Sequence, residues 1–301
     1  MSFTDKLKAG APTLSFELFP PKNPLGWGTL YGTLGEICKL APDYISVTYG
    51  AGGSTRVKTV ELVGRIQGEL GIESMAHLTC VGHSKSEILD ILRTLEASGI
   101  RNVLALRGDP PKGDAHFKPH PDGFVHASDL IGFIRSHSGL SIGCAFYPEK
   151  HLEAVSLEAD IGHLKTKQDN GAGFTISQLF FDNDTFYRFR DKAAKAGVTI
   201  PMVAGIMPVL DVNQLGRFKE LSGCIIPEKL TAFLAAGSPG AGTSGDVAQR
   251  GVEYASEQCR DLLENGIAGI HLYSLNRSLS SVRITENLRR QGYFPVSPAK
   301  T

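Results

Sequence analysis

Eight short apolar runs alternate with longer stretches of helical spacing along the 301 residues, and this alternation predicts a single closed (β/α)8 barrel, or TIM barrel. Alternation of strand and helix demands parallel strands joined by right-handed crossovers. Eight such units over this length fit a closed barrel better than an open doubly wound sheet, which is the structural alternative.

The predicted strands are rich in Val, Ile, Phe and Tyr, and Gly, Pro, Asn or Asp stands at or near most of their ends. In chain order they are LSFELFPP (14–21), YISVTYG (44–50), SMAHLTC (74–80), NVLALRGD (102–109), SIGCAFYP (141–148), FTISQLFF (174–181), PMVAGIMP (201–208) and GIHLYSLN (269–276). The intervening stretches have apolar residues three or four positions apart and Gly near the C-terminal end, as in KSEILDILRTLEASG and NDTFYRFRDKAAKAG, so we expect helices there.

The seventh connection, at about 209–268, is the exception among the predicted loops and helices. It contains three helical patterns and the Gly/Ser-rich run 237–245, which we expect to be an exposed mobile loop. The residues beyond Tyr293 resemble a short C-terminal tail. No other linker or repeat stands out, so we expect one domain over residues 1–301.

Composition excludes several classes of partner. The 31 Lys+Arg balance 31 Asp+Glu, which removes the basic footprint expected for binding nucleic acid or an anionic membrane. No run of about 18 apolar residues and no signal-length N-terminal run occurs, so we expect a soluble, cytoplasmic protein. The five cysteines are odd in number, scattered and without zinc-like spacing, which predicts reduced core thiols and no metal site.

Strand alternation places polar residues toward the predicted barrel interior. In the first strand Leu14, Phe16 and Leu18 form one face, so Glu17 should point inward, where a carboxylate is costly unless it is paired or protonated. The other polar residues expected at the C-terminal mouth are Ser46, Thr48, His77, Thr79, Arg107, Asp109, Tyr147, Glu149, Gln178, Asp182, Tyr273 and Arg277. Such a set suits a site for a polar organic molecule.

Each of these residues also has a structural explanation when taken alone. Glu17 is then more often an ion-pair or hydrogen-bond partner, His77 a satisfied core histidine, and Arg107 with Asp109 a pair that closes a loop. The run YGAGGST (49–55) does not complete G-x-G-x-x-G, and no Walker, H-E-x-x-H or G-x-S-x-G motif occurs. The backbone amides of the run 49–55 could hold a phosphate or ribose oxygen, or the run could simply form a tight turn.

Eight blocks in this order resemble the bacterial methylenetetrahydrofolate reductases, which are flavin-containing (β/α)8 barrels of the catalytic-domain-only type. They are SFELFPPK, VTYGAGGSTR, HLTC, ALRGDPP, FYPEKH, ISQLFFD, GIMPV and LYSLNR. The resemblance implies FAD-dependent reduction of 5,10-methylenetetrahydrofolate to 5-methyltetrahydrofolate in one-carbon metabolism. Hydride would pass from NADH or NADPH through flavin N5. It also implies a homo-oligomer, and the choice of nicotinamide stays open.

The resemblance assigns roles residue by residue. Glu17 matches the general acid that supplies the proton for opening the folate ring, and Asp109 matches an aspartate near flavin and folate. We expect these two carboxyl groups to project from neighbouring strands. FAD-contact positions fall on Thr48, Tyr49, Ala51, His77, Arg107, Gly108, Asp109, Ala127, Tyr147, His151, Ala154, Asp160 and Lys167. Folate positions fall on Gln178, Gln214, Phe218, Tyr273 and Arg277.

Two alternatives compete with this interpretation. A flavin-free barrel lyase or aldolase would need an inward lysine, and none of the eight predicted strands contains one. A non-catalytic folate- or flavin-binding subunit would not require the acid at Glu17 or the carboxylate at Asp109. His163 and Thr166 stand at positions that vary among relatives, so the resemblance assigns neither of them a contact with the adenosine half of FAD.

Overall fold

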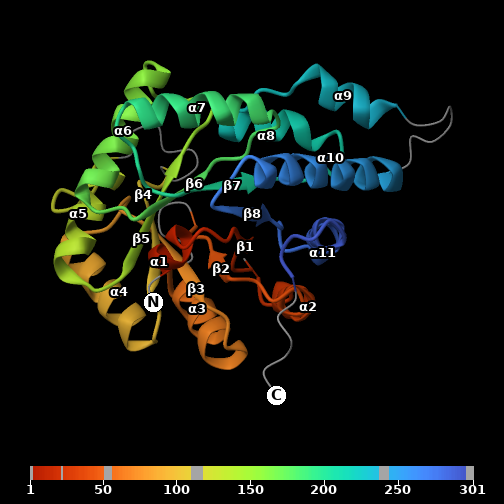
Figure 1. Ribbon diagram of the computed structural model, residues 1–301. Helices are drawn as coiled ribbons and strands as arrows, with labels where there is room; N and C mark the ends of the chain where they lie inside the picture. The colour runs from red at the N-terminus through yellow and green to blue at the C-terminus, as the bar shows by residue number, and fades with distance from the viewer. Residues whose placement is uncertain (1–2, 22, 51–55, 110–117, 237–243, 296–301) are drawn as a thin grey trace.

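The computed structural model describes residues 3–21, 23–50, 56–109, 118–236 and 244–295. Within them, eight parallel strands close into one barrel in chain order, with β8 paired to β1 (Figure 1). The predicted (β/α)8 barrel is therefore confirmed, and the open sheet is excluded. The predictions for Ala51 and for residues 237–243 of the Gly/Ser-rich run lie outside the described residues.

All eight predicted strands are present, and each ends earlier than predicted. They are β1 (Thr13–Leu18), β2 (Tyr44–Val47), β3 (Ser74–Thr79), β4 (Asn102–Leu106), β5 (Ser141–Phe146), β6 (Phe174–Ser177), β7 (Met202–Ile206) and β8 (Gly269–Tyr273). The backbone leaves the extended region soon after the last ladder residue, as Gly108, Leu275 and Asn276 show by their positive φ angles. The polar residues at the ends of the predicted strands consequently stand on loops rather than on strands.

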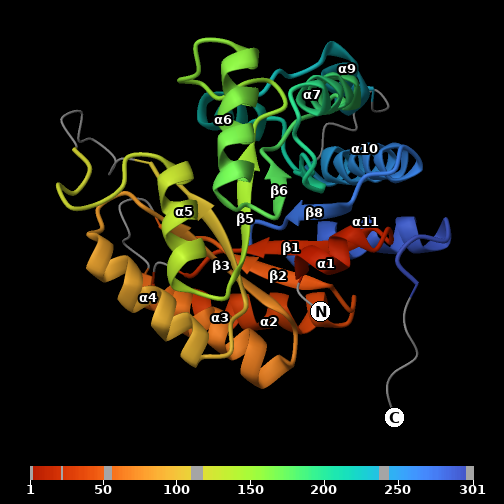
Figure 2. The ribbon, with the colours of Figure 1, turned by 60° about the vertical axis from the view of Figure 1, so that its left-hand side comes forward.

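Helix α1 lies at the N-terminal end of the barrel, and the other helices lie around its outside (Figure 2). They are α1 (Phe3–Lys8), α2 (Gly26–Cys38), α3 (Arg56–Leu70), α4 (Lys85–Ala97), α5 (Ala127–His137), α6 (Leu157–Asn170), α7 (Asn183–Lys195), α8 (Gln214–Ser222), α9 (Glu228–Ala235), α10 (Ser244–Glu264) and α11 (Ser278–Arg290). The seventh connection carries the three expected helices, α8, α9 and α10. In α4 a capping box between Ser84 and Glu87 satisfies backbone donors that the first turn leaves free.

The main core lies between the outward faces of the strands and the helices. Leu14, Phe16 and Leu18 of β1 are buried in it, as the alternation predicts. The sequence did not predict α1, because six residues are too short to show a helical period. Phe3 of α1 enters a second cluster inside the barrel, where its ring meets Tyr44 edge-on at 4.4 Å between centroids. The α1 helix therefore closes the N-terminal end of the barrel with apolar side chains.

Candidate active site

The barrel interior has a polar side and an apolar side. Inward-facing polar residues come from β8, β1, β2 and β3, and are Ser15, Glu17, Ser46, His77 and His271. The opposite side is built by β4, β6 and β7, and contributes Leu104, Phe174, Ile176 and Val203. The apolar residues pack with Phe3 of α1 and are buried, so the hydrogen-bonding groups of the interior are concentrated on one side of the barrel.

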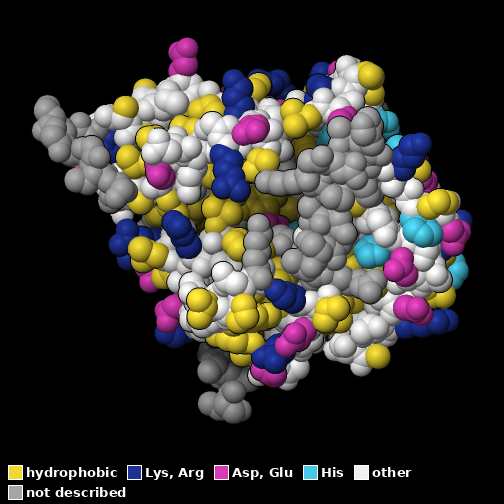
Figure 3. Space-filling model, turned by 180° about the vertical axis from the view of Figure 1, so that it is seen from behind, with side chains coloured by type: hydrophobic (Ala, Val, Ile, Leu, Met, Phe, Trp, Pro, Cys, Tyr) yellow, Lys and Arg dark blue, Asp and Glu magenta, His cyan; other side chains and the backbone are white. Residues whose placement is uncertain are grey.

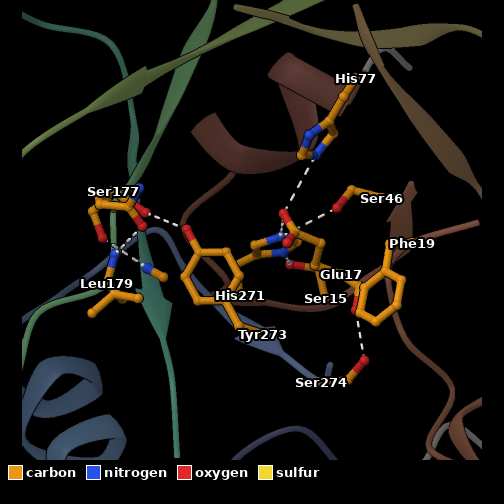
Figure 4. A network of polar contacts seen from close by, with 12 residues as sticks. Ser15, Glu17, Phe19, Ser46, His77, Ser177, Leu179, His271, Tyr273 and Ser274 are labelled. Carbon is orange, nitrogen blue, oxygen red and sulfur yellow. Dashed lines mark hydrogen bonds and ion pairs between the residues drawn. The ribbon is translucent and has the colours of Figure 1, made fainter. Parts of the chain in front are cut away.

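Glu17 lies at the centre of the polar side (Figure 4). In the strand register its neighbours are Ser46 on β2 and Tyr273 on β8. Its Oε2 atom is 3.5 Å from Nε2 of His77 and 3.9 Å from Nε2 of His271, and the side chain keeps 20% of its surface exposed. The carboxyl group thus faces two imidazoles and retains access to the mouth, as a group that transfers a proton to a bound molecule requires.

His271 forms the floor beneath Glu17 and was missed in the sequence. Its Nδ1 atom lies 2.7 Å from Oγ of Ser15, and its Nε2 atom lies 3.2 Å from Oγ of Ser46. The ring also stacks on Tyr44 with an interplanar angle of 11°. The signal that could have found it is the alternation in GIHLY, which puts His271 on the same face as Tyr273.

His77 is buried on β3 and is neutral at physiological pH. Burial lowers the pKa of its imidazole to about 4, which outweighs the opposite effect of the Glu17 carboxylate. Within the described residues, Nε2 of His77 and Oγ1 of Thr79 on the same strand have no hydrogen-bond partner. Buried polar atoms of this kind are normally satisfied, so these two orphaned groups indicate a place for a bound polar molecule.

Tyr273 contributes a hydroxyl group and an aromatic wall. Its hydroxyl donates a hydrogen bond of 2.7 Å to the carbonyl oxygen of Ser177. Burial, reinforced by the charge on Glu17, raises the pKa of the phenol well above its usual value, so it stays protonated. Tyr273 also packs against the apolar cluster that contains Phe218 and Phe181. Phe218, on α8, is thus buried in this cluster, and a contact with a ligand stays a prediction for it.

Arg107 reaches a partner that the sequence did not predict. Its guanidinium forms a bidentate ion pair with Glu153 on the loop after β5, with Nη2 2.8 Å from Oε1. Leu104 and Leu106 pack in the interior cluster. Because successive residues of a strand point to opposite faces, the side chain of Arg107 points away from the barrel interior. The structural alternative, in which Arg107 pairs with Asp109, is not what the structure shows, because Glu153 binds the guanidinium.

Gly108 and Asp109 form the rim after β4. Gly108 has φ +86°, and a Cβ atom at this position would lie 2.8 Å from Cβ of Thr79, so only glycine fits. Asp109 is exposed, and its charge contributes to the raised pKa of Arg107. The expectation that Glu17 and Asp109 project from neighbouring strands is wrong, because β1 is bordered by β2 and β8 while Asp109 follows β4. Both residues still belong to the same end of the barrel.

The loop after β5 and the first turn of α6 gather four predicted flavin positions, three on the loop and Asp160 on the helix. Tyr147 and His151 meet edge-on at 4.6 Å between centroids, and the backbone N–H of His151 donates to Oδ2 of Asp160 at 2.8 Å. The Ala154 N–H donates to the His151 carbonyl at 3.0 Å. Burial, followed by the charge of Asp109, raises the pKa of Tyr147 to about 12. Lys167 stands apart, since its Nζ donates to the Ala145 carbonyl at 2.8 Å.

The remaining predicted positions are distributed around the mouth. The hydroxyl oxygen of Tyr49 lies 3.1 Å from Nε2 of His83. The backbone N–H of Thr48 donates to the Leu18 carbonyl and so continues the pairing of β1 with β2, and Ala127 is buried at the start of α5. The side-chain amide oxygens of Gln178 and Gln214 accept hydrogen bonds from nearby backbone N–H groups, at Leu179 and Leu210 respectively. Arg277 stands at the residue before α11, makes no capping hydrogen bond through its side chain, and is exposed. The structure therefore places Tyr273 beside Glu17, whereas the two glutamines support their own loops.

Surface charge is mixed on the face seen in Figure 3, where basic and acidic side chains are interspersed and hydrophobic side chains line a central hollow. Among the described residues, no group of three or more His, Cys, Asp or Glu side chains is placed to hold a metal ion. Within the same ranges, every helix is too short or too polar to cross a bilayer.

A closed barrel that gathers a carboxyl group, two imidazoles and phenols at the carboxyl ends of its strands has the architecture of the (β/α)8 enzymes. The family model described as methylenetetrahydrofolate reductase matches residues 2–289. The chain therefore belongs to the methylenetetrahydrofolate reductase family, whose named members are oxidoreductases.

Curated relatives agree with this assignment. The 5,10-methylenetetrahydrofolate reductase of Salmonella typhimurium is 34% identical over 282 residues, which are 93% of this chain and 91% of that protein. Methylenetetrahydrofolate reductase (NADH) 1 of Arabidopsis thaliana is 37% identical over 303 residues, but the chain spans only 51% of it. The chain thus covers about half the length of the plant relatives that it matches.

A similar fold occurs in a solved structure of an uncharacterized protein from Clostridium thermocellum that binds two copies of 5-methyl-5,6,7,8-tetrahydrofolic acid. The TM-score is 0.68, the sequences are 16% identical, and the match covers 95% of this chain and 98% of that one. At this identity the likeness shows the fold alone.

Proposed function

We propose that this chain, as one catalytic domain, reduces 5,10-methylenetetrahydrofolate to 5-methyltetrahydrofolate with FAD and a reduced nicotinamide, NADH or NADPH. The observation that carries the proposal is the position of Glu17, whose carboxyl group stands at the barrel mouth between the neutral His77 and Tyr273. Membership of the family supports the reaction, and the folate bound by the Clostridium thermocellum neighbour supports the substrate class.

Glu17 would act as the general acid. Opening the five-membered ring of the folate requires a proton at the departing nitrogen, and a carboxyl group within hydrogen-bond reach of that nitrogen supplies it. His77 is uncharged at neutral pH and therefore gives Glu17 no cationic partner on this side. His271, held by Ser15 and Ser46, fixes the floor on which the carboxyl group rests.

FAD, when bound, would supply the hydride chemistry by accepting a hydride from the nicotinamide and passing it to the folate. The residues present fit such a group. His77 and Thr79 offer two buried polar atoms that accept or donate no hydrogen bond among the described residues. Gly108 lets the turn after β4 approach Thr79 more closely than a residue with a Cβ atom could. Tyr147 and His151 would support the ring from the loop after β5. Arg107 binds Glu153 in this structure, and it would balance phosphate charge by exchanging that carboxylate for the phosphate.

The folate would lie beside Glu17, with Tyr273 as the aromatic wall. Asp109 would stabilise positive charge on the folate during ring opening. Gln178, Gln214, Phe218 and Arg277 are proposed to complete this side.

The purified protein should be yellow, and its visible spectrum should be that of bound flavin. It should oxidise NADH or NADPH only when an acceptor is present, and the methylene folate should be converted to the methyl form. A colourless protein that takes up no FAD and oxidises neither nicotinamide would refute the proposal. Flavin binding without turnover would instead favour a binding subunit.

A further inference from the structure

Glu149 connects the loop after β5 to the end of helix α8. Its Oε2 atom accepts a hydrogen bond of 3.0 Å from the backbone N–H of Ile225, three residues beyond the last residue of α8. A second contact lies beside the first, because Gly223 ends α8 in the left-handed region with φ +73° and packs against the side chain of Leu152. Two residues of the β5 loop thus hold the C-terminal end of α8.

The two segments joined in this way carry different halves of the proposed site. The β5 loop carries Tyr147 and His151, which are proposed to contact FAD. Helix α8 begins at Gln214 and carries Phe218, which are proposed to contact folate. Glu149 itself has no role in either set, and its contact is the hydrogen bond to Ile225.

The carboxyl group of Glu149 is poorly solvated. Its Oε1 atom is buried without a hydrogen-bond partner among the described residues. Burial raises its pKa to about 7, although the Ile225 N–H acts in the opposite direction, and the charge of Asp182 raises it further. Asp182 precedes α7 and binds Lys229 of α9 at 2.6 Å, and the buried Cys224 thiol follows α8. These are the titratable and charged groups that face Glu149 from α7, α8 and α9.

We propose that Glu149 is a positioning residue that holds α8 on the β5 loop and thereby sets the affinity of the site for folate, without contacting either ligand. The part that concerns folate rests on the proposed function. The docking of α8 rests only on the contacts of Glu149 and Leu152.

The pH dependence of the docking follows from linkage. When α8 is docked the carboxyl group has a pKa of about 7, whereas in water it would have its ordinary value near 4.5. The docked state therefore binds more protons, so docking is strongest below the ordinary pKa and weakens as pH rises through 7. A glutamine at this position keeps an acceptor oxygen and does not titrate, so its docking should not change with pH.

Hydrogen exchange on the full-length protein tests the docking directly. Glu149→Ala should increase exchange in residues 214–225, after correction for intrinsic rates, while Glu220→Ala on the exposed face of the same helix should not. In the wild type, protection of this segment should fall between pH 6 and pH 8, and in Glu149→Gln it should stay constant. Equal protection in the wild type, Glu149→Ala and Glu220→Ala would overturn the proposal. If Glu149→Ala does not fold, an identical pH response in the wild type and Glu149→Gln would do the same.

Kinetics tests the consequence for folate. Glu149→Ala should raise KM for the methylene folate by about tenfold, as expected for one lost hydrogen bond, with kcat within about twofold and flavin reduction by nicotinamide unchanged. Glu149→Gln should restore KM. An equal loss in both half-reactions would mean that Glu149 supports the whole fold rather than the folate side. A wild type without turnover would refute the proposed function, and the exchange experiment would still decide the docking.

Discussion

The Oε2 atom of Glu17 on β1 lies 3.5 Å from Nε2 of His77 on β3, across the width of β2. The contact joins a carboxyl group that keeps access to the mouth and an imidazole that is buried. Because burial lowers the pKa of His77 to about 4, the pair does not behave as an ordinary ion pair at neutral pH. The geometry leaves the carboxyl group of Glu17 accessible to a molecule bound above it.

Replacement of this acid should separate the two half-reactions. In Glu17→Gln the reduction of flavin by nicotinamide should proceed at the wild-type rate, because that step needs no proton from residue 17. Oxidation of the reduced flavin by the methylene folate should slow by about 100-fold or more, as for the loss of a general acid. Stopped-flow absorbance measures both steps, with the exposed Glu36→Gln as the control. Equal slowing of both steps would mark Glu17 as a structural residue.

His77 should contribute to acid instability. Its folded-state pKa of about 4 lies below the ordinary value of 6.5, so the unfolded chain binds more protons and stability falls as pH drops from 6.5 toward 4. Between pH 7 and pH 5 this residue alone should cost about 2 kcal/mol. Urea unfolding at both pH values should show that His77→Gln loses less stability than the wild type, whereas the exposed His137→Gln loses the same amount. The prediction fails if all three proteins respond alike.

Gly108 should be needed for the flavin side of the site. In Gly108→Ala the left-handed backbone costs about 1–2 kcal/mol, and the new methyl group also meets Thr79. We expect FAD affinity to fall by about tenfold, because the turn that carries Asp109 must move. Gly99→Ala is a matched control, since its φ is +75° but nothing lies within 4 Å of a Cβ atom there. Titration of the two variants with FAD should therefore differ, although both lose stability.

The closure of the barrel by α1 should matter for stability and not for chemistry. Phe3 is buried against Tyr44 and Phe174, so Phe3→Ala should destabilise the protein by about 3–5 kcal/mol. Lys8→Ala, on the exposed side of the same helix, should have little effect. Thermal unfolding measures the difference. Loss of FAD binding by Phe3→Ala well below its melting temperature would show that α1 supports the mouth as well.

The fold was predictable because its signal is local and repeated eight times. Each strand presents an apolar outer face, as Leu14, Phe16 and Leu18 do, and each is followed by a helix with its own period. The inward position of Glu17 followed from the same alternation. The ends of the strands were less predictable. The backbone leaves the strand pairing where a residue such as Gly108 or Asn276 adopts a positive φ angle, and the sequence alone identifies only some of these residues.

Partners between loops could not be predicted. Arg107 pairs with Glu153, 46 residues away on the next loop, and no periodicity connects the two. His271 was missed for another reason. A histidine inside an apolar strand gives the same sequence pattern whether its side chain fills the core or belongs to an active site. Its place beneath Glu17 depends on the pairing of β1 with β8, which only closure of the barrel creates.

That pairing also determines when the site can exist. The hydroxyl of Ser274 donates to the carbonyl of Glu17, and the amide of Asn276 binds both backbone groups of Phe19, 257 residues earlier in the chain. A ribosome must therefore synthesise the chain as far as residue 276 before the acid has these neighbours. A nascent or truncated chain that lacks the eighth strand carries Glu17 without His271, Tyr273 and Ser274 beside it.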